Sequence, residues 1–256
     1  MKKHIPNFIT LLNLFLGCWA IVFAFQSGAM ATMDDAGNMI IEIPEKMYYA
    51  SLFIGLAALA DFFDGGAARL LKVNSDLGKQ LDSLSDVVSF GVAPSIIVFQ
   101  FLRLSLATDI NALSQTTLFM APAFIIAIAG AYRLAKFNID PAQTTYFKGV
   151  PIPMIGLLTA AFPLVYWQSN TTIFSKLLLS PVFWYLYIIV VSYLMIMSRP
   201  MLALKNLSKK KNLILPLLLV GVEVVITAFF FKWMAIPFGF IGYLLVSLLY
   251  KKTITQ

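Results

Sequence analysis

Cysteine and histidine are almost absent from this sequence, which contains one of each. Cys18 has no partner within the chain, so an intramolecular disulfide is excluded, and with it any disulfide-stabilised scaffold. His4 is the single imidazole, which excludes most zinc-ligand sets and every catalytic triad that depends on histidine. Any chemistry must therefore use carboxylates, hydroxyls and the basic groups of lysine and arginine.

Charged residues are scarce as well. They make up 12% of the chain, against 60% for hydrophobic residues. The mean hydropathy of +0.84 lies far above the range of soluble domains. We therefore predict an integral membrane protein. The net charge of +7 indicates membrane topology and contact with anionic lipids, and predicts no nucleic-acid partner.

Apolar runs divide the sequence into membrane spans. A hydrocarbon core of about 30 Å needs roughly 20 helical residues. By this measure we predict an all-α polytopic fold with about eight transmembrane helices. The expected spans are 8–27, 46–72, 79–103, 115–137, 150–168, 180–199, 212–231 and 233–250. The last two spans are separated only by Lys232 and its neighbours.

The distribution of basic residues predicts the orientation, because cytoplasmic loops retain lysine and arginine. With the N-terminus inside, all but four of the 19 basic residues face the cytoplasm. The four exceptions are Lys46, Arg103, Lys176 and Lys232. We expect both termini to be cytoplasmic, in the cytoplasmic membrane if the cell is bacterial. The run Lys209–Lys211 is predicted to be a lipid-facing basic patch.

Four carboxylates mark the boundary between the second and third spans. Asp61 and Asp64 are three residues apart, and Asp82 and Asp86 are four apart, so each pair lies on one face of its helix. The short turn between the two spans should bring these faces together at the cytoplasmic boundary. Carboxylates at a membrane boundary are costly to desolvate and repel one another unless cations meet them.

Basic residues near these acids are fewer than the acids themselves. They are Arg69, Lys72 and Lys79. Hard divalent cations with oxygen ligands are the natural complement, and Mg²⁺ or Mn²⁺ commonly shares its coordination between carboxylates and substrate phosphates. Capping or helix packing can explain a single aspartate or glycine, but packing requires no set of four carboxylates.

The small residues after Asp64 fit a ligand site. The stretch Gly65–Ala68 is nearly devoid of side-chain bulk, which lets a ligand or another helix approach the backbone. Arg69 follows Gly65 by four residues on the same face and could pair with a phosphate.

The pattern Asp61-x2-Asp64-Gly65-x2-Ala68-Arg69-x8-Gly78-x3-Asp82-x3-Asp86 resembles the signature of the CDP-alcohol phosphatidyltransferases, with every fixed position filled. The resemblance implies a six-helix core over residues 1–200 with a cytoplasmic metal site. A basic loop and a C-terminal helix pair would follow over residues 201–256. It also implies that the four acids hold two divalent ions. The residues it assigns to the CDP-lipid are Gly65, Ala68, Arg69, Ser75 and Gly78.

Other stretches resemble the phosphatidylserine synthase branch of this family. They are IPNFITLLNLFLGC at 5–18, GKQLDSLSDVVSFGVAPS at 78–95, YRLAKFN at 132–138 and FKGVPIP at 147–153. This resemblance implies that CDP-diacylglycerol and L-serine give phosphatidylserine and CMP. Asp86, the last acid on its helix, is the expected general base. Inositol, inositol phosphate or glycerol 3-phosphate remain alternative acceptors, and an ion-coupled transporter is the alternative of another class.

A serine acceptor needs a cation for its carboxylate. Arg133, Lys136 and Lys148 flank the cytoplasmic segment 138–149, and Asn138 could add a hydrogen bond. The alternative is that these basic residues only follow the positive-inside rule.

Polar residues within the spans have two interpretations. Asn7, Thr10 and Asn13 recur at helical spacing, where they could contact the cytidine or a neighbouring helix. Glu223 is costly within its span and is a candidate contact between helices or subunits. The resemblance to this family also implies a homodimer.

Overall fold

The structure is a computed structural model, and it describes residues 4–26, 30–33, 39–42, 46–71, 75–106, 117–139, 147–168, 172–202 and 214–249. Within these ranges the chain is helical apart from two short two-stranded sheets. The predicted Lys209–Lys211 patch and the rest of the basic loop lie outside the described residues.

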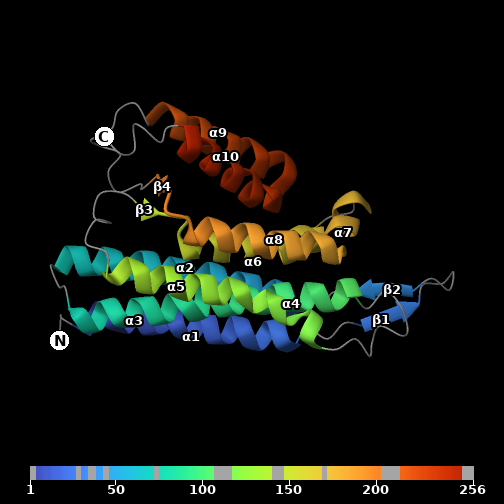
Figure 1. Ribbon diagram of the computed structural model, residues 1–256, viewed down its shortest axis with the longest axis horizontal. Coiled ribbons are helices and arrows are strands. Elements are labelled where there is room, and N and C mark those ends of the chain that lie inside the picture. The colour runs from blue at the N-terminus through green and yellow to red at the C-terminus, as the bar shows by residue number, and fades with distance from the viewer. Residues whose placement is uncertain are drawn as a thin grey trace.

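Apolar helices run back and forth along one bundle (Figure 1). The α-helices are α1 (Ile5–Gln26), α2 (Lys46–Leu71), α3 (Asp76–Asp86), α4 (Ala93–Leu106), α5 (Ile125–Ile139), α6 (Ile152–Gln168), α7 (Thr172–Leu178), α8 (Pro181–Ile196), α9 (Ile214–Phe231) and α10 (Ala235–Leu249). The π-helix η2 (Val87–Val92) joins α3 to α4, and the 3-10 turns are η4 (Thr117–Phe119), η5 (Ala121–Phe124) and η9 (Lys232–Met234). The strands are β1 (Met30–Met33), β2 (Met39–Glu42), β3 (Phe147–Lys148) and β4 (Pro200–Met201), with β1 paired to β2 and β3 to β4.

The helix lengths confirm the predicted polytopic fold. Five helical segments of the described chain are long and apolar enough to cross a membrane, and two shorter apolar helices, α6 and α8, accompany them. The C-terminal segment 215–249 is continuous in hydropathy, yet the chain reverses within it (Figure 1). The reversal occurs at Lys232, whose φ of 47° lies in the left-handed region. The two final spans are thus an antiparallel pair, α9 and α10.

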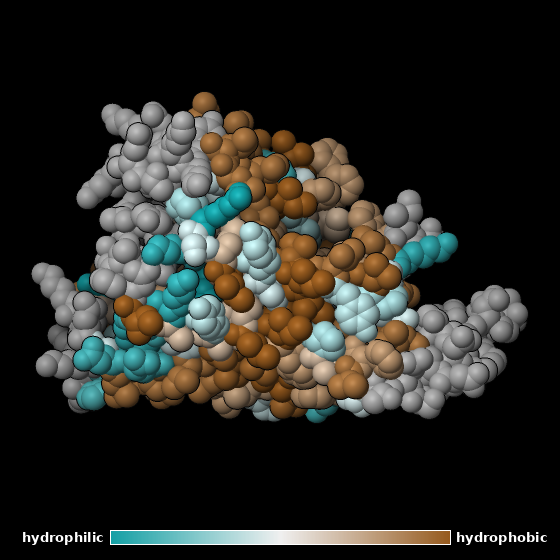
Figure 2. Space-filling view, viewed as in Figure 1, coloured by the Kyte–Doolittle hydropathy of each residue, from teal (hydrophilic) through white to brown (hydrophobic). Residues whose placement is uncertain are grey.

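The end of the bundle where α2 stops and α3 starts is called the motif end here. In Figure 1 it is the left end, where α1 and α9 also begin and α10 finishes. Figure 2 shows apolar side chains over the middle of the molecule, with hydrophilic ones gathered towards the motif end. Large apolar side chains that face outward include Phe8, Phe15, Ile128 and Phe229. Such a surface suits a hydrocarbon environment.

A π-helical segment follows Asp86 directly, at the centre of the bundle. Pro94 has no N–H and its ring disfavours a regular turn before it. The N–H of Ala93 bonds to the carbonyl of Val88, five residues back, which widens the helix at this point. Gly17 of α1 lies so close to Ser89 that a Cβ there would clash with the serine backbone. This close approach holds α1 against the turn that carries Asp86.

A short strand pair closes the motif end between α5 and α8. Phe147 pairs with Met201 and Lys148 with Pro200. Gly149 then adopts φ +73°, and a Cβ at this position would lie 2.4 Å from the carbonyl oxygen of Met195, so only glycine fits. The segment that leads into α6 is thereby held against the end of α8.

Candidate active site

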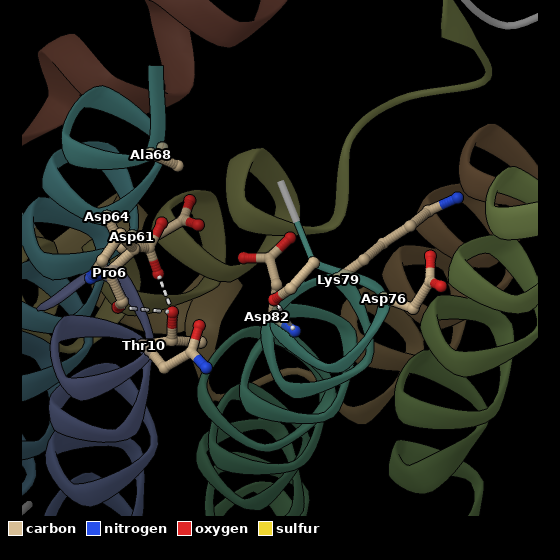
Figure 3. Close-up of a pocket in the computed structure, with 12 residues that line it drawn as sticks. Pro6, Thr10, Asp61, Asp64, Ala68, Asp76, Lys79 and Asp82 are labelled. Atoms are coloured by element: carbon tan, nitrogen blue, oxygen red, sulfur yellow. Dashed lines mark hydrogen bonds between the residues drawn. The ribbon is translucent and has the colours of Figure 1, made fainter. Parts of the chain in front are cut away.

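Three carboxylates converge at the motif end. Asp61 and Asp64 lie on the last turns of α2, and Asp82 lies on α3 across the turn. Carboxylate oxygens of the three residues lie within 4.8 Å of one another. Figure 3 shows them around one space, with Asp82 facing the pair from α2. The structure therefore brings the two helix faces together as the spacing predicts.

Asp86 lies one helical turn further along α3, inside the bundle. It is 7% exposed and remains within electrostatic range of Asp61, Asp64 and Asp82. Among the described residues, the group with mutually close ligand atoms contains the other three acids and not Asp86. Asp86 is thus the member of the four-acid set that lies furthest along α3 into the bundle, and it is called the innermost acid for this reason.

A polar cavity of about 440 Å³ opens in front of these acids. The predicted residues that line it are Asn7, Thr10, Asp61, Asp64, Gly65, Ala68, Ser75, Gly78 and Asp82. The remaining lining residues, which sequence reasoning did not select, are Pro6, Asp76 and Lys79. Arg69, predicted to contact phosphate, is exposed at the end of α2 and is not among the lining residues.

Two glycines shape this cavity in different ways. A Cβ at Gly65 would meet no atom within 4 Å, so the backbone there is open to a ligand. A Cβ at Gly78 would lie 2.9 Å from the Ser75 hydroxyl and 3.0 Å from the side-chain oxygen of Asn7. Glycine at 78 therefore lets the start of α3 approach α1. Ser75 caps α3 by accepting a hydrogen bond from the Gly78 N–H at 3.0 Å.

Helix α1 supplies hydrogen-bond donors to acids of both helices. The Thr10 hydroxyl lies 2.7 Å from a carboxylate oxygen of Asp64 and 3.0 Å from the carbonyl of Pro6 (Figure 3). The Asn13 amide donates to Asp86 at 3.4 Å. Of the two interpretations of these polar residues, the contact with neighbouring helices is present for Thr10 and Asn13. Thr10 also lines the cavity and remains available to a nucleotide.

Ser85 and Ser89, which the sequence analysis did not select, form hydrogen bonds with the backbone of α1. The Ser85 hydroxyl donates to the Thr10 carbonyl at 3.1 Å, and the Ser89 hydroxyl donates to the Asn13 carbonyl at 3.0 Å. The two serines are four residues apart and alternate with Asp82 and Asp86, and this spacing could have indicated that they share a helix face with the acids.

Lys79 is directed away from the acids. Its ammonium donates to the backbone carbonyl of Asn138 at 3.0 Å, and Figure 3 shows the side chain extending away from Asp61 and Asp64. The Asn138 amide in turn donates to the Ser83 hydroxyl at 2.8 Å. Asn138, which was predicted to contact the acceptor, therefore links α3 to α5 through these two hydrogen bonds.

The predicted basic residues gather beside this site. Arg133, Lys136 and Lys148 line one small hollow together with Tyr132 and residues 195–197. Arg133 is 7% exposed, its Nη2 lies 3.5 Å from the Gly149 carbonyl, and its Nε has no hydrogen-bond partner among the described residues. It also lies within electrostatic range of Asp86. Arg133 is therefore a buried cation with one donor that has no partner among the described residues.

The donor set at the cavity suits a metal ion. Asp61, Asp64 and Asp82 offer only hard oxygen ligands, and the negative charges of Asp82 and Asp64 act on Asp61. Such a set matches the preference of Mg²⁺ or Mn²⁺ rather than that of a soft metal. These three residues could hold a metal ion.

Residues 3–182 match the family described as CDP-alcohol phosphatidyltransferase. The chain belongs to this family. The match covers the four acids, the cavity and Arg133. It ends at the start of α8, so β4, α9 and α10 of this family member lie beyond it.

Several characterised proteins are similar to this phosphatidyltransferase. The CDP-diacylglycerol–serine O-phosphatidyltransferase of Bacillus subtilis is 37% identical over 141 residues, which are 52% of this chain and 75% of that protein. The protein of the same name from Saccharomyces cerevisiae is 33% identical over 159 residues, 59% of this chain and 50% of the yeast protein. The archaetidylserine synthase of Methanothermobacter thermautotrophicus is 32% identical over 136 residues, 52% of this chain and 54% of that protein. The matches thus span three quarters of the first relative and about half of the other two.

Proposed function

We propose that this enzyme transfers the phosphatidyl group of CDP-diacylglycerol to the hydroxyl of L-serine, giving phosphatidylserine and CMP. The observation that carries the proposal is the convergence of Asp61, Asp64 and Asp82 on one polar cavity, with Asp86 and the buried Arg133 within electrostatic range of one another. The names of the bacterial and yeast relatives support serine as the acceptor.

The CDP-lipid would occupy the cavity. Its pyrophosphate would lie over the open backbone at Gly65 and Ala68, with Ser75 and Gly78 on the other wall. Asn7 and Thr10 would contact the nucleotide from α1, and Arg69 would reach the phosphates from the rim. When bound, two divalent ions held by the four acids would offset the charge on the pyrophosphate and on the departing CMP.

Asp86 is assigned as the general base. It would accept the proton of the serine hydroxyl as the serine oxygen attacks the phosphorus that bears the diacylglyceryl ester. The new oxygen–phosphorus bond forms while the bond from that phosphorus to CMP breaks. Asp86 suits this role because it is the acid furthest along α3 into the bundle, is buried and lies within electrostatic range of Arg133.

Recognition of serine is assigned to the basic hollow. The Arg133 guanidinium has an unpaired Nε–H among the described residues and could donate to the serine carboxylate. Lys136 and Lys148 line the same hollow and would add positive charge. Asn138 would join them only if its bond to Ser83 were released. The positive charge of this hollow favours an acceptor with an anionic group, such as the carboxylate of serine, so inositol phosphate and glycerol 3-phosphate are stronger competitors than inositol.

The site is proposed to face the cytoplasm, where serine is available. The positive-inside distribution of basic residues supports this orientation, and α1 and α9 begin, while α10 finishes, at the motif end (Figure 1). We propose residues 1–200 as the catalytic core and 201–256 as a basic loop with the C-terminal helix pair. Anionic lipids would surround the motif end, and a homodimer is the proposed assembly.

The test is an acceptor screen with purified protein, CDP-diacylglycerol and Mg²⁺ or Mn²⁺. Release of CMP is expected with serine and not with the other alcohols. A protein that ignores serine but uses a phosphorylated alcohol would refute the choice of acceptor. Absence of CMP release with every acceptor would refute the transferase itself.

A further inference from the structure

The C-terminal helix pair has two unlike members. Helix α9 shows most of its surface, and Leu218, Val225 and Phe229 are each more than half exposed. Helix α10 instead turns polar side chains inward, because Tyr243 is 8% exposed and Ser247 is fully buried. These two residues are four apart and share one face of the helix. A simple membrane anchor would need no hydroxyls on its inner face.

Both hydroxyls bond to one backbone unit outside their helix. The Tyr243 hydroxyl donates to the carbonyl of Leu202 at 3.1 Å. The N–H of Leu202 donates to the Ser247 hydroxyl at 3.4 Å. Helix α10 therefore satisfies both polar groups of Leu202, the residue directly after β4.

Contacts continue from β4 to the basic hollow. Strand β4 pairs with β3, and the N–H of Gly149 donates to the carbonyl of Arg199 at 3.0 Å. The carbonyl of the same Gly149 faces Nη2 of Arg133 at 3.5 Å. Gly149 has little freedom to move, because it is enclosed by the end of α8 in a left-handed conformation. A continuous set of backbone contacts thus links α10 to the guanidinium of Arg133.

The position of Tyr243 agrees with this connection. Tyr243 lies within electrostatic range of Arg133 as well as in hydrogen-bond contact with Leu202. Leu202 and Met201 are themselves almost completely buried. Tyr243 therefore connects α10 to Leu202 and lies near Arg133.

We propose that α10 is a latch for the acceptor site, in which Tyr243 and Ser247 hold Leu202 and β4 so that Gly149 can orient Arg133. The two hydroxyl residues are positioning residues that act through Arg133 and do not touch the substrate. The inference rests on the proposed function, since that assigns Arg133 to the carboxylate of the acceptor. It gives a role in acceptor recognition to a part of the chain beyond the family match.

The kinetic test compares variants that remove one hydroxyl each. Tyr243→Phe and Ser247→Ala should raise the KM for serine roughly threefold to tenfold, the effect of losing one hydrogen bond. The KM for CDP-diacylglycerol should change less than about twofold on the same basis. Matched controls are Tyr185→Phe, which removes a hydroxyl bonded to the carbonyl of Phe119 at 2.8 Å, and Ser51→Ala, which removes one bonded to Met47 at 3.3 Å. The controls should leave both constants unchanged.

Combining Tyr243→Phe with Arg133→Lys tests the connection. If α10 acts through Arg133, the tyrosine change should have little further effect on the KM for serine once the guanidinium is gone. Independent, multiplying effects of the two changes would overturn the proposal. An equal rise in both substrate constants would do so as well, because it would indicate a general loss of packing.

Hydrogen exchange provides a readout that requires no substrate. Tyr243→Phe should speed the exchange of the Gly149 and Leu202 amides, whereas Tyr185→Phe should not. Unchanged exchange overturns the latch whatever the acceptor is. Faster exchange with an unaltered serine KM, in an enzyme that does use serine, overturns its role in acceptor binding. If serine is not a substrate at all, the proposed function fails while the exchange result still decides whether the latch exists.

Discussion

The side-chain amide of Asn13 donates a hydrogen bond to the carboxylate of Asp86 over 3.4 Å, joining the first helix to the innermost acid. Asn13 is fully buried, and its Oδ1 has no hydrogen-bond partner among the described residues. What distinguishes Asn13 is that its donor meets the Asp86 carboxylate, which favours a positioning role over a packing role.

Replacing Asn13 should impair turnover more than binding. In Asn13→Ala, loss of a hydrogen bond to a carboxylate is worth about 1.5–3 kcal/mol, so we expect kcat to fall roughly 10-fold to 100-fold. The KM for CDP-diacylglycerol should stay within about twofold, because Asp86 lies behind the cavity. Steady-state CMP release measures both constants.

A second buried amide provides the control for that change. Gln100 is 2% exposed, donates to the carbonyl of Ala24 at 2.9 Å and likewise leaves its Oε1 without a partner among the described residues. Gln100→Ala should leave kcat unchanged. Equal losses in the two variants would indicate that any buried amide serves only the packing.

Asp86→Asn should separate chemistry from binding. The amide keeps the size of the carboxylate but cannot accept the serine proton, so kcat should fall by about 10²-fold to 10⁴-fold. Binding of CDP-diacylglycerol, measured by calorimetry with Mn²⁺ present, should persist. Retained turnover would remove Asp86 from the role of base. Lost binding would assign it to the metal site alone.

Removal of divalent ions should abolish turnover reversibly. The three close carboxylates, Asp61, Asp64 and Asp82, repel one another, and a bound cation would offset this repulsion. Treatment with EDTA should stop CMP release, and added Mg²⁺ or Mn²⁺ should restore it. In Asp82→Asn the Mn²⁺ affinity, followed by electron paramagnetic resonance, should fall at least about 10-fold. An unchanged Mn²⁺ affinity in this variant would show that Asp82 is not a ligand of the ion.

Two adjacent glycines should respond differently to a methyl group. Neither Gly65 nor Gly66 has an atom within 4 Å of a Cβ placed on it, but only Gly65 lines the cavity. Gly65→Ala should therefore raise the KM for CDP-diacylglycerol roughly 10-fold by occupying ligand space. Gly66→Ala should leave KM unchanged and raise thermal stability slightly, because alanine favours the helix. If the two variants had the same KM for CDP-diacylglycerol, the lipid headgroup would not bind over α2 at Gly65.

The sequence alone was sufficient where short-range rules apply. Apolar runs predict the spans because helix length must match the thickness of the hydrocarbon core. The spacing of Asp61, Asp64, Asp82 and Asp86 predicts two facing carboxylate pairs because helical periodicity is local. The structure agrees on the apolar spans, and it brings Asp61, Asp64 and Asp82 close together with Asp86 outside that group. The reversal between the last two spans was also predicted from the sequence. It occurs at Lys232, although lysine is not a typical turn residue.

Only tertiary structure decided which distant residues meet. Thr10 and Asp64 are 54 positions apart, and Asn13 and Asp86 are 73 apart, so their contacts depend on how closely α1 packs. That distance is set by glycines and by the π-helical widening after Asp86, which no local pattern measures. The same reason explains why Asn138 bonds to Ser83 instead of facing the hollow.

The chain itself therefore determined the membrane setting, the four acids and the family, because these depend on composition and spacing. Packing of helices from opposite ends of the sequence decided the rest. It buried Asp86 within the bundle, directed Lys79 away from the other three acids and brought Tyr243 of α10 to Leu202. Contacts of this kind arise from the shapes of whole helix faces, and those shapes exist only once the bundle has assembled.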